Sequence, residues 1–388
     1  MPSFITDRSC LLCSDPVKIP GDESGDKENS VLFRVAEGLR ERIEQSKEYT
    51  VVSEKDSEPQ KLPVFESWMW SSEYDEALKF EKQLLKQYQG KTFEEALPEG
   101  KVISNKQGNC YEISTTCFST FRNTTCEKSR QILLSDLKVL PGIGLVTEQI
   151  LKNEGYPTVE DLTRHPRWTK QAQTYLKLVN TKKVDLLQTW LWQRLPKSHP
   201  LLHYLAGFCQ NQDFAIIDIE TLGLSERPII LLGIAKPTKN NSLSTKQFLL
   251  QDIPDEPSAL WALLSQINPQ LALITYNGKS FDVPYIKQRL AYYGINASID
   301  NPNFDVLHFT RRALKPKLAN CRLETVEKYL GIKRDINIPG ALVPHFYDTY
   351  LRTKNVGPLI PIVEHNRQDL LTLATLFSKL YEEWQFDK

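Results

Sequence analysis

The spacing of hydrophobic and polar positions changes near residue 214. Before it, residues 73–97 and 131–205 repeat apolar positions at helical spacing. After it, short apolar runs predict buried strands, and helical spacing predicts the segments between them. The predicted strands cover 214–219, 229–235, 246–250 and 271–276, a further element begins at Phe304, and the predicted helices cover 257–267, 282–294 and 358–380. This order predicts an α/β fold with a mixed sheet flanked by helices.

The region before residue 131 has two different characters. Residues 1–64 contain long stretches of Pro, Gly, Ser and charged residues, which bury too little apolar surface to offset chain entropy. We expect a loosely ordered tail there. Residues 65–130 are expected to form a small α+β segment, because apolar and polar residues alternate over 101–122 and predict a β-hairpin.

Composition is that of an ordinary globular protein. Of the 388 residues, 40% are hydrophobic and 25% are charged, which excludes a wholly disordered or collagen-like chain. Lys and Arg total 48, as do Asp and Glu, so a uniformly basic surface is excluded while local basic patches are not. No apolar run reaches the roughly 18–20 residues that span a bilayer, and the first residues lack a signal-peptide pattern.

Cysteine usage favours a reducing compartment. The seven cysteines are odd in number and sparsely placed, as expected for free thiols rather than for a disulfide scaffold. Cys10 and Cys13 have the spacing of a zinc-binding pair, but the other cysteines are widely spaced, so structural zinc is disfavoured. We expect a soluble cytoplasmic protein that does not bind membranes.

Two carboxylates end the first predicted strand of the α/β region. Asp218 and Glu220 are two residues apart, so their side chains point to the same face of the strand. Neighbouring anions at the end of an apolar strand repel each other, and a divalent cation would relieve the repulsion. The alternative is an exposed strand end, and a single D-x-E motif does not exclude it.

Two later segments carry further acids at element ends. Asp282 opens the helix after the strand at 271–276, where ligands bind in open α/β folds, although an N-cap carboxylate is a common alternative. His365 and Asp369 are four residues apart on the last helix and share one face, although a solvated polar turn is the alternative there. If these segments converge, four carboxylates can hold two Mg²⁺ or Mn²⁺ ions for phosphodiester hydrolysis, with His365 as the general base.

At this point the chain resembles a known family. The order D-x-E, N-x-x-x-F-D and a helix-borne Asp resembles the DEDD superfamily of 3′–5′ exonucleases on the ribonuclease H-like fold, and more narrowly the YprB-like ribonuclease-H-like proteins. The segments with this resemblance are DIETLGL (218–224), ITYNGKSFDVPYIKQR (274–289), DVLHFTRRALK (305–315), CRLETVEKYLGIKR (321–334), IPG (338–340) and EHNRQDLLTL (364–373). The resemblance implies a five-stranded sheet with helices on both sides over residues 212–388. It also implies metal binding by Asp218, Glu220, Asp282 and Asp369.

The third motif departs from the superfamily pattern. DEDD exonucleases have either a Tyr four residues before the last Asp or a His five residues before it. Here His365 lies four residues before Asp369, so the spacing matches one type and the residue matches the other. The YprB-like group shares this HN-x-x-D form, and the identity of the general base stays open.

A second resemblance is to a helix-hairpin-helix module over residues 131–206. In LKVLPGIGLVTEQILKNEGYPTVEDL (137–162), the residues Pro141 to Gly144 lie between two apolar helices. Gly142, Ile143 and Gly144 would let the backbone approach a phosphate, which free N–H groups of the second helix would bind without reading base sequence. A hairpin used only for packing is the alternative.

Two basic runs accompany these motifs. Residues 163–183 hold six Lys or Arg and residues 311–322 hold five, with no acid in either run, which is typical of phosphate contacts or of solvated faces. Trp168, Trp190 and Trp192 can stack on bases, but their spacing favours a core position. The residues assigned to nucleic-acid contacts are Gly142, Ile143, Gly144, Thr221, Leu222, Asn277, Arg311, Arg312 and Lys315.

The combined prediction is a metal-dependent 3′–5′ exonuclease with DNA as its preferred partner, and DNA repair is the expected pathway. A base-excision glycosylase is disfavoured, because Val146 occupies the position where bifunctional glycosylases have a catalytic Lys. Two alternatives stay open. One is a catalytically silent DNA-binding or scaffold protein with a nuclease-like fold, and the other is an RNA-directed ribonuclease.

Overall fold

The structure is a computed structural model, and it describes residues 64–119, 121–223, 226–334, 336 and 338–384. Side chains are described from Tyr74 onward. The predicted tail over residues 1–64, apart from the backbone of residue 64, and the pair Cys10 and Cys13 therefore lie outside the described residues.

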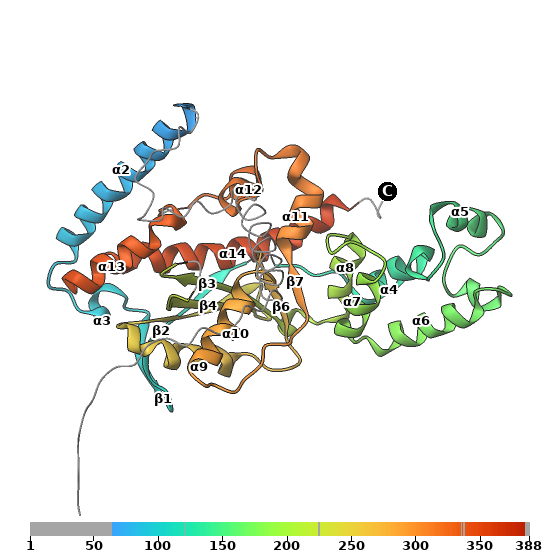
Figure 1. Ribbon diagram of the computed structural model, residues 1–388, viewed down its shortest axis with the longest axis horizontal. Coiled ribbons are helices and arrows are strands. Elements are labelled where there is room, and N and C mark those ends of the chain that lie inside the picture. Colours follow the sequence, from blue (N-terminus) through green and yellow to red (C-terminus); the bar gives the residue numbers. More distant parts are fainter. Residues whose placement is uncertain (1–63, 120, 224–225, 335, 337, 385–388) are drawn as a thin grey trace, which may run out of the picture. The chain divides into compact units, whose positions relative to one another are not determined.

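A seven-stranded mixed sheet forms the centre of the described chain (Figure 1). Its order is β1-β2-β5-β4-β3-β6-β7. The strands are β1 (Gly100–Asn105), β2 (Gly108–Phe118), β3 (Phe214–Thr221), β4 (Ile229–Pro237), β5 (Ser242–Leu249), β6 (Ala272–Thr275) and β7 (Asn303–Asp305). Pairs from β1 to β3 are antiparallel, and β3–β6 and β6–β7 are parallel.

The central strands are buried on both faces. Alternate residues of β3 enter different hydrophobic core clusters, with Phe214 and Ile216 in one and Ala215 and Ile217 in the other. This alternation follows from the two-residue period of a strand, and helices cover both faces. They are α9 (Glu256–Gln266), α10 (Asp282–Tyr292), α11 (Val306–Leu314), α12 (Leu323–Leu330), α13 (Val343–Thr353) and α14 (Leu359–Glu383).

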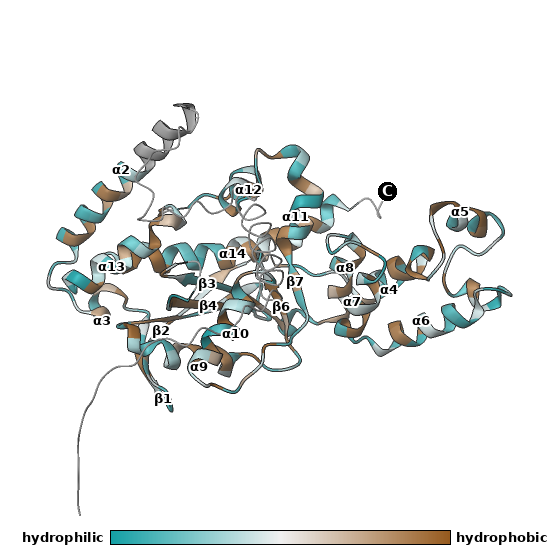
Figure 2. Ribbon diagram, in the orientation of Figure 1, coloured by the Kyte–Doolittle hydropathy of each residue, from teal (hydrophilic) through white to brown (hydrophobic). Residues whose placement is uncertain are grey.

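The longest of these helices, α14, crosses the sheet and contacts β3, β4, β5 and β6. In Figure 1 it lies with α13 on one side of the strands, opposite α9 and α10. Hydrophilic and hydrophobic residues mix along α13 and α14 in Figure 2, as expected for helices with one face on a sheet and one toward solvent. Thirteen residues of α14 are nevertheless buried, so it is a central part of the core.

The helical region precedes β3, and its aromatic residues pack on the end of α14. It contains α4 (Cys126–Ser135), α5 (Leu145–Asn153), α6 (Thr169–Thr181), α7 (Val184–Trp192) and α8 (Pro200–Tyr204), after α2 (Val64–Gln87) and α3 (Phe93–Ala96). The His203 ring stacks on Tyr381 with centroids 3.9 Å apart, and its Nδ1 accepts a hydrogen bond of 2.8 Å from Trp384 Nε1. The helical region therefore shares a core with the sheet.

The predicted α/β fold class is confirmed, with one difference in strand number. The four strands predicted between residues 214 and 276 form, the element expected at Phe304 is the short strand β7 followed by α11, and the predicted hairpin forms as β1 and β2. The sheet has seven strands rather than five because β2 pairs with β5, so the hairpin extends the sheet at its β5 edge. The domain boundaries stay a prediction. Among the described residues, no helix is both long enough and apolar enough to cross a membrane.

Candidate active site

The first two predicted carboxylates lie where β3 ends. Asp218 pairs in register with Gly233 of β4 and Glu220 with Leu231, and the register shifts between Glu220 and Thr221. Both acids are half-buried, while Ile217 and Ile219 are buried. The strand therefore presents both carboxylates on one face beside the core.

Asp282 lies at the start of α10, next to the same strand. Its side chain is buried, with 5% of its surface exposed, and the backbone of Ile219 in β3 hydrogen-bonds its carboxylate. The preceding loop is fixed by Asp305, whose Oδ1 accepts from the N–H of Asn277 at 2.9 Å and whose Oδ2 accepts from the N–H of Lys279 at 3.1 Å. Asp305 is thus a sequence-distant residue that shapes the loop leading to Asp282.

Asp369 completes the set from α14. Burial and repulsion from Asp369, Glu220 and Asp282 hold the pKa of Asp218 well above its usual range. Burial, followed by repulsion from Asp369 and Asp282, has the same effect on the pKa of Glu220. Burial is also the largest cause that raises the pKa of Asp282 to about 7 and that of Asp369 to about 6. The four carboxylates therefore lie close enough to repel one another, in surroundings that favour either protonation or a cation.

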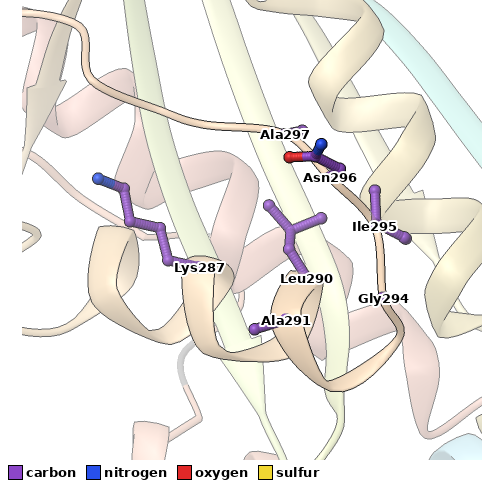
Figure 3. A pocket seen from close by; sticks show the side chains of 7 residues that line it. All are labelled: Lys287, Leu290, Ala291, Gly294, Ile295, Asn296 and Ala297. Carbon is purple, nitrogen blue, oxygen red and sulfur yellow. The ribbon is translucent and has the colours of Figure 1, made fainter.

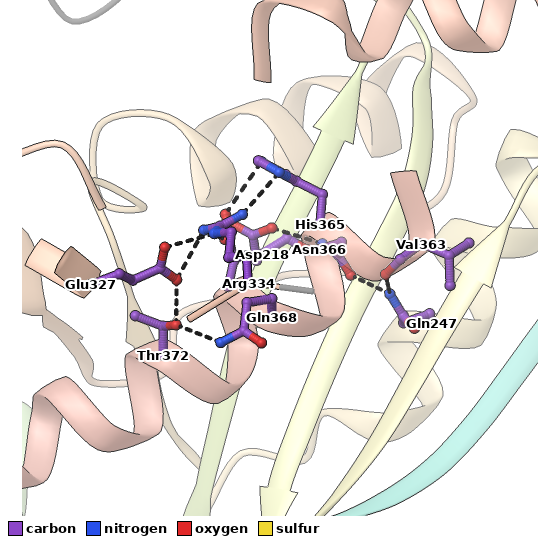
Figure 4. A network of polar contacts seen from close by, with 10 residues as sticks. Asp218, Gln247, Glu327, Arg334, Val363, His365, Asn366, Gln368 and Thr372 are labelled. Carbon is purple, nitrogen blue, oxygen red and sulfur yellow. Dashed lines mark hydrogen bonds and ion pairs between the residues drawn. The ribbon is translucent and has the colours of Figure 1, made fainter. Parts of the chain in front are cut away.

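Asp218 is held by an amide chain that the sequence analysis did not identify (Figure 4). Asn366 Nδ2 donates to Asp218 Oδ2 at 2.7 Å and to its backbone oxygen at 3.1 Å. Asn366 Oδ1 accepts from Gln247 Nε2 at 2.9 Å, and Asn366 and Gln247 are both almost fully buried. Gly233 makes room for this amide, because a Cβ there would lie 2.2 Å from Asn366 Oδ1.

A buried arginine provides the positive charge nearest to these acids. Arg334 forms an ion pair with Asp369, and its Nε donates to Glu327 Oε2 at 2.6 Å. Only 6% of its side chain is exposed, against 3% for Glu327 and 13% for Asp369. Thr372 Oγ1 donates to the same Glu327 at 2.5 Å, as Figure 4 shows. In this arrangement a guanidinium, rather than a metal ion, neutralises Asp369.

His365 lies inside this network rather than at its edge. Arg334 Nη1 lies 2.9 Å from His365 Nδ1, and because a guanidinium only donates, Nδ1 accepts and the ring hydrogen is on Nε2. His365 Nε2 lies 3.7 Å from Asp369 Oδ2. Burial, followed by repulsion from Arg334, lowers the pKa of His365 to about 4. The ring is therefore neutral at pH 7, and its role as a general base stays a prediction.

The donor chemistry fits a hard divalent cation. The carboxylates of Asp218, Glu220, Asp282 and Asp369 supply only oxygen ligands, as Mg²⁺ and Mn²⁺ prefer. Burial, with repulsion between the acids, raises the pKa of Asp218, Glu220 and Asp282, so a cation would stabilise their charged forms. Among the described residues, no group of three or more acids, histidines or cysteines is arranged as metal ligands. With Arg334 on Asp369, the acids would have to rearrange to bind metal.

The predicted nucleic-acid contacts fall at several places. Thr221 and Leu222 follow Glu220 directly and are half-buried, and Thr221 Oγ1 donates to the Gly223 carbonyl at 2.8 Å. Asn277 has φ 63° in the loop before Asp282. The basic residues Arg311, Arg312 and Lys315 lie at the end of α11 and just after it. Thr221, Leu222 and Asn277 therefore border the carboxylates in sequence and structure.

The predicted hairpin forms between a short 3-10 turn at Leu137–Val139 and α5. Gly142 has φ 83°, in the region that favours glycine, and Ile143 is buried. Gly144 is the N-cap of α5 and has no side chain to cap the first N–H groups. A 3-10 turn, a glycine-containing turn and α5 thus follow one another here. The helix-hairpin-helix module and its binding of nucleic acid stay predictions.

A surface pocket of about 370 Å³ lies at the other end of α10 (Figure 3). It is lined by Lys287, Leu290, Ala291, Gly294, Ile295, Asn296 and Ala297. Lys287 pairs with Asp300 at 2.7 Å. Asp282 begins this helix and Leu290 is eight residues later, a separation of about 12 Å along the axis at about 1.5 Å per residue. The pocket is therefore separate from the carboxylates.

Comparison with known proteins places the sheet and its following helices in a known superfamily. Residues 215–381 match the family model RNase_H_2, described as RNase_H superfamily. These residues form an RNase H superfamily domain. The chain is also 34% identical over 193 residues to the uncharacterized protein YprB of Bacillus subtilis (strain 168), a match that covers 48% of this chain and 46% of YprB. The chain therefore spans about half the length of this curated relative.

Solved structures of E. coli exonuclease I give weaker matches. The complex with a dT13 oligonucleotide is 16% identical, covers 41% of this chain and 45% of that chain, and has a TM-score of 0.27. The zinc ion bound form of an exonuclease I–ssDNA complex is 17% identical, with the same coverage and a TM-score of 0.26. At these TM-scores the likeness supports no conclusion about ligand or reaction.

Sequence reasoning found the acids and missed the residues that hold them. Asn366 and Arg334 are both within the segments that resemble the YprB-like group, and that was the available signal. Glu327 also lies in one of these segments, but it reads as an ordinary helix acid. Gln247 had no such signal, because it lies outside them and reads as a weak strand position. Their roles depend on contacts across 119 and 45 residues of chain.

Proposed function

We propose that this chain is a divalent-metal-dependent nuclease that hydrolyses phosphodiester bonds, most specifically as a 3′–5′ exonuclease acting on DNA. The observation that carries the proposal is the meeting of four carboxylates from β3, α10 and α14. Burial raises the pKa of each acid, and repulsion between the acids adds to the shifts of Asp218, Glu220 and Asp282. The RNase H superfamily match over residues 215–381 supports the same reaction class.

Asp218, Glu220, Asp282 and Asp369 would hold the metal ions in this proposal. Two bound ions supply an activated water and stabilise the leaving oxygen in phosphodiester hydrolysis. The chain's own contribution is to hold the ligands in place. Asn366 fixes the Asp218 carboxylate, and the backbone of Ile219 fixes that of Asp282. Second-shell contacts of this kind determine how well ligands are oriented.

Arg334 and His365 have linked roles in the proposal. Arg334 neutralises Asp369 and donates to Nδ1 of His365. Metal binding by Asp369 would require this ion pair to open, which would also leave Nδ1 available to accept a proton. His365 then serves as the general base, in the position that the sequence assigns to it.

DNA is the proposed substrate because of the helical region. The hairpin at Gly142 to Gly144 presents uncapped backbone N–H groups of α5, which suit a phosphate. A contact of this kind docks a strand without reading its bases. An RNA substrate would use the same carboxylates.

A second candidate is a nucleic-acid-binding protein without hydrolytic activity. The Arg334–Asp369 ion pair favours it, because a guanidinium already neutralises one of the four acids. In that case the carboxylates would be structural, and no divalent cation would bind.

Hydrolysis of end-labelled oligonucleotides tests the proposal. DNA and RNA labelled at the 5′ end are incubated with the purified chain and Mg²⁺ or Mn²⁺, beside Asp218→Asn. We expect a ladder shortened from the 3′ end, and a rate at least about 10³-fold lower in the variant, because several kcal/mol of charge stabilisation is lost. The matched control is Asp300→Asn, at an exposed carboxylate that pairs with Lys287 far from the four acids. Equal rates for wild type and Asp218→Asn would refute the site assignment.

A further inference from the structure

A basic cluster with no role in the reaction proposed above lies beside the loop that leads to Asp282. It consists of Lys279 in that loop, Lys197 between α7 and α8, His308 on α11, and the indole of Trp192 at the end of α7. Lys279 Nζ lies 4.4 Å from the centroid of the Trp192 ring. The basic cluster thus brings together residues from four separate segments.

Helix α7 connects this cluster to the predicted DNA-binding hairpin. Gln188 Nε2 donates to the Asn303 carbonyl of β7 at 3.4 Å, which ties α7 to the edge of the sheet. Trp190 Nε1 donates to the Val139 carbonyl at 2.9 Å, directly before the hairpin. Helix α7 thus contacts both the edge of the sheet and the segment just before the hairpin.

The basic cluster holds more positive charge than its neighbouring acid can balance. Burial lowers the pKa of Lys279 to about 8; attraction to Asp305 opposes this shift and repulsion from Lys197 adds to it. Burial, with repulsion from Lys279 and Lys197, also lowers the pKa of His308, against the attraction of Asp305. Asp305 already accepts three backbone N–H groups. A bound anion would relieve this repulsion by charge-assisted hydrogen bonds.

Trp192 and Lys197 are accessible to a ligand. Trp192 has 38% of its surface exposed, and Lys197 is exposed and forms no ion pair with a carboxylate among the residues that the structure describes. An exposed indole offers a stacking surface to any base. The chemistry of the cluster therefore matches one nucleotide of a strand, with a phosphate on the lysines and a base near the indole.

We propose that Lys279, Lys197 and Trp192 bind a nucleotide of the strand whose end enters the carboxylates. This inference rests on the proposed function and names a substrate contact for it. Lys279 is three residues from Asp282, so their Cα atoms are at most about 11 Å apart. Successive nucleotides of a strand are about 3.4 Å apart, so this distance corresponds to about three nucleotides. The contact positions the strand and ignores base sequence.

Binding of a fluorescein-labelled dT oligonucleotide to the full chain, followed by anisotropy in EDTA, tests this contact without hydrolysis. The variants are Lys279→Gln and Lys197→Gln. The matched control is Lys106→Gln, because Lys106 also lies over an indole, 3.5 Å from the centroid of the Trp261 ring, but on the β1–β2 hairpin. Each variant is first checked for an unchanged urea midpoint, because Lys279→Gln keeps the backbone bond to Asp305 but removes the cation above the Trp192 ring.

We expect Lys279→Gln and Lys197→Gln each to weaken binding about 3- to 10-fold and to reduce the slope of log affinity against log salt by about 0.7. Lys106→Gln should leave both unchanged. Wild-type binding with an unaffected Lys279→Gln variant would overturn the contact but leave the proposed nuclease intact. Failure of the wild type to bind any oligonucleotide would overturn both.

Discussion

Replacing Arg334 by Met tests whether the carboxylates form a cation site. The substitution keeps much of the apolar side-chain volume and removes the charge that is paired with Glu327 and Asp369. Because all three side chains are at most 13% exposed, the acids would be left buried and unpaired. Removal of one partner from such a buried pair destabilises a protein by about 3–5 kcal/mol. We expect this loss for Arg334→Met in EDTA.

A divalent cation should then recover much of the lost stability. With Asp369 free of Arg334, Mn²⁺ at about 100 times its Kd would stabilise the variant by about 2.7 kcal/mol. The wild type should gain less, because metal binding must first break the Arg334–Asp369 pair. Urea unfolding in EDTA and in Mn²⁺ measures both quantities and requires no enzyme activity.

Arg289 provides the matched control. Its Nη2 pairs with Glu256 Oε2 at 2.5 Å, and both side chains are buried, with 6% and 0% exposed. Arg289→Met should therefore lose a similar amount of stability, but its acid lies outside the four carboxylates and Mn²⁺ should not restore it. If Mn²⁺ stabilises Arg334→Met no more than Arg289→Met, the carboxylates are not a cation site.

Two other changes test how the core and the site are held together. Burial lowers the pKa of His203 to about 3, below its unfolded value of about 6.5, so acid favours the unfolded state and costs about 2 kcal/mol of stability between pH 7 and 5. His203→Gln should lose about 2 kcal/mol less over that interval, measured by urea unfolding, and an equal loss would contradict the assignment. Gly233→Ala places a Cβ against Asn366; the melting temperature should fall and Mn²⁺ affinity should weaken, whereas unchanged affinity would show that Asn366 does not position Asp218.

The local period of the sequence was enough to predict the elements that position the acids. The run at 214–219 gave β3 with Asp218 and Glu220 at its end, and the apolar helix after Asp369 gave α14. These features follow from side-chain periodicity, which is a local property. The sequence therefore predicts which residue types meet at the site better than it predicts the contacts between them.

Features that depend on distant contacts were not predictable in the same way. The hairpin at residues 100–118 joins the sheet through β5, which is about 130 residues later, as in the pairing of Thr115 with Thr245. The Arg334–Asp369 pair joins the loop after α12 to α14, across 35 residues of chain. The local spacing of apolar residues does not show which strand a hairpin pairs with, or which carboxylate forms an ion pair with a given arginine.

The length of α14 has a consequence for protein engineering. This single helix of 25 residues includes Asn366 and Asp369 in its first half and Tyr381 near its end. The Tyr381 ring stacks on His203. Replacing the helical region with another module would expose Tyr381 to solvent and destabilise the helix that positions Asn366 and Asp369. A chimera would therefore have to retain the partners of Tyr381, and screening libraries should vary both ends of α14 together.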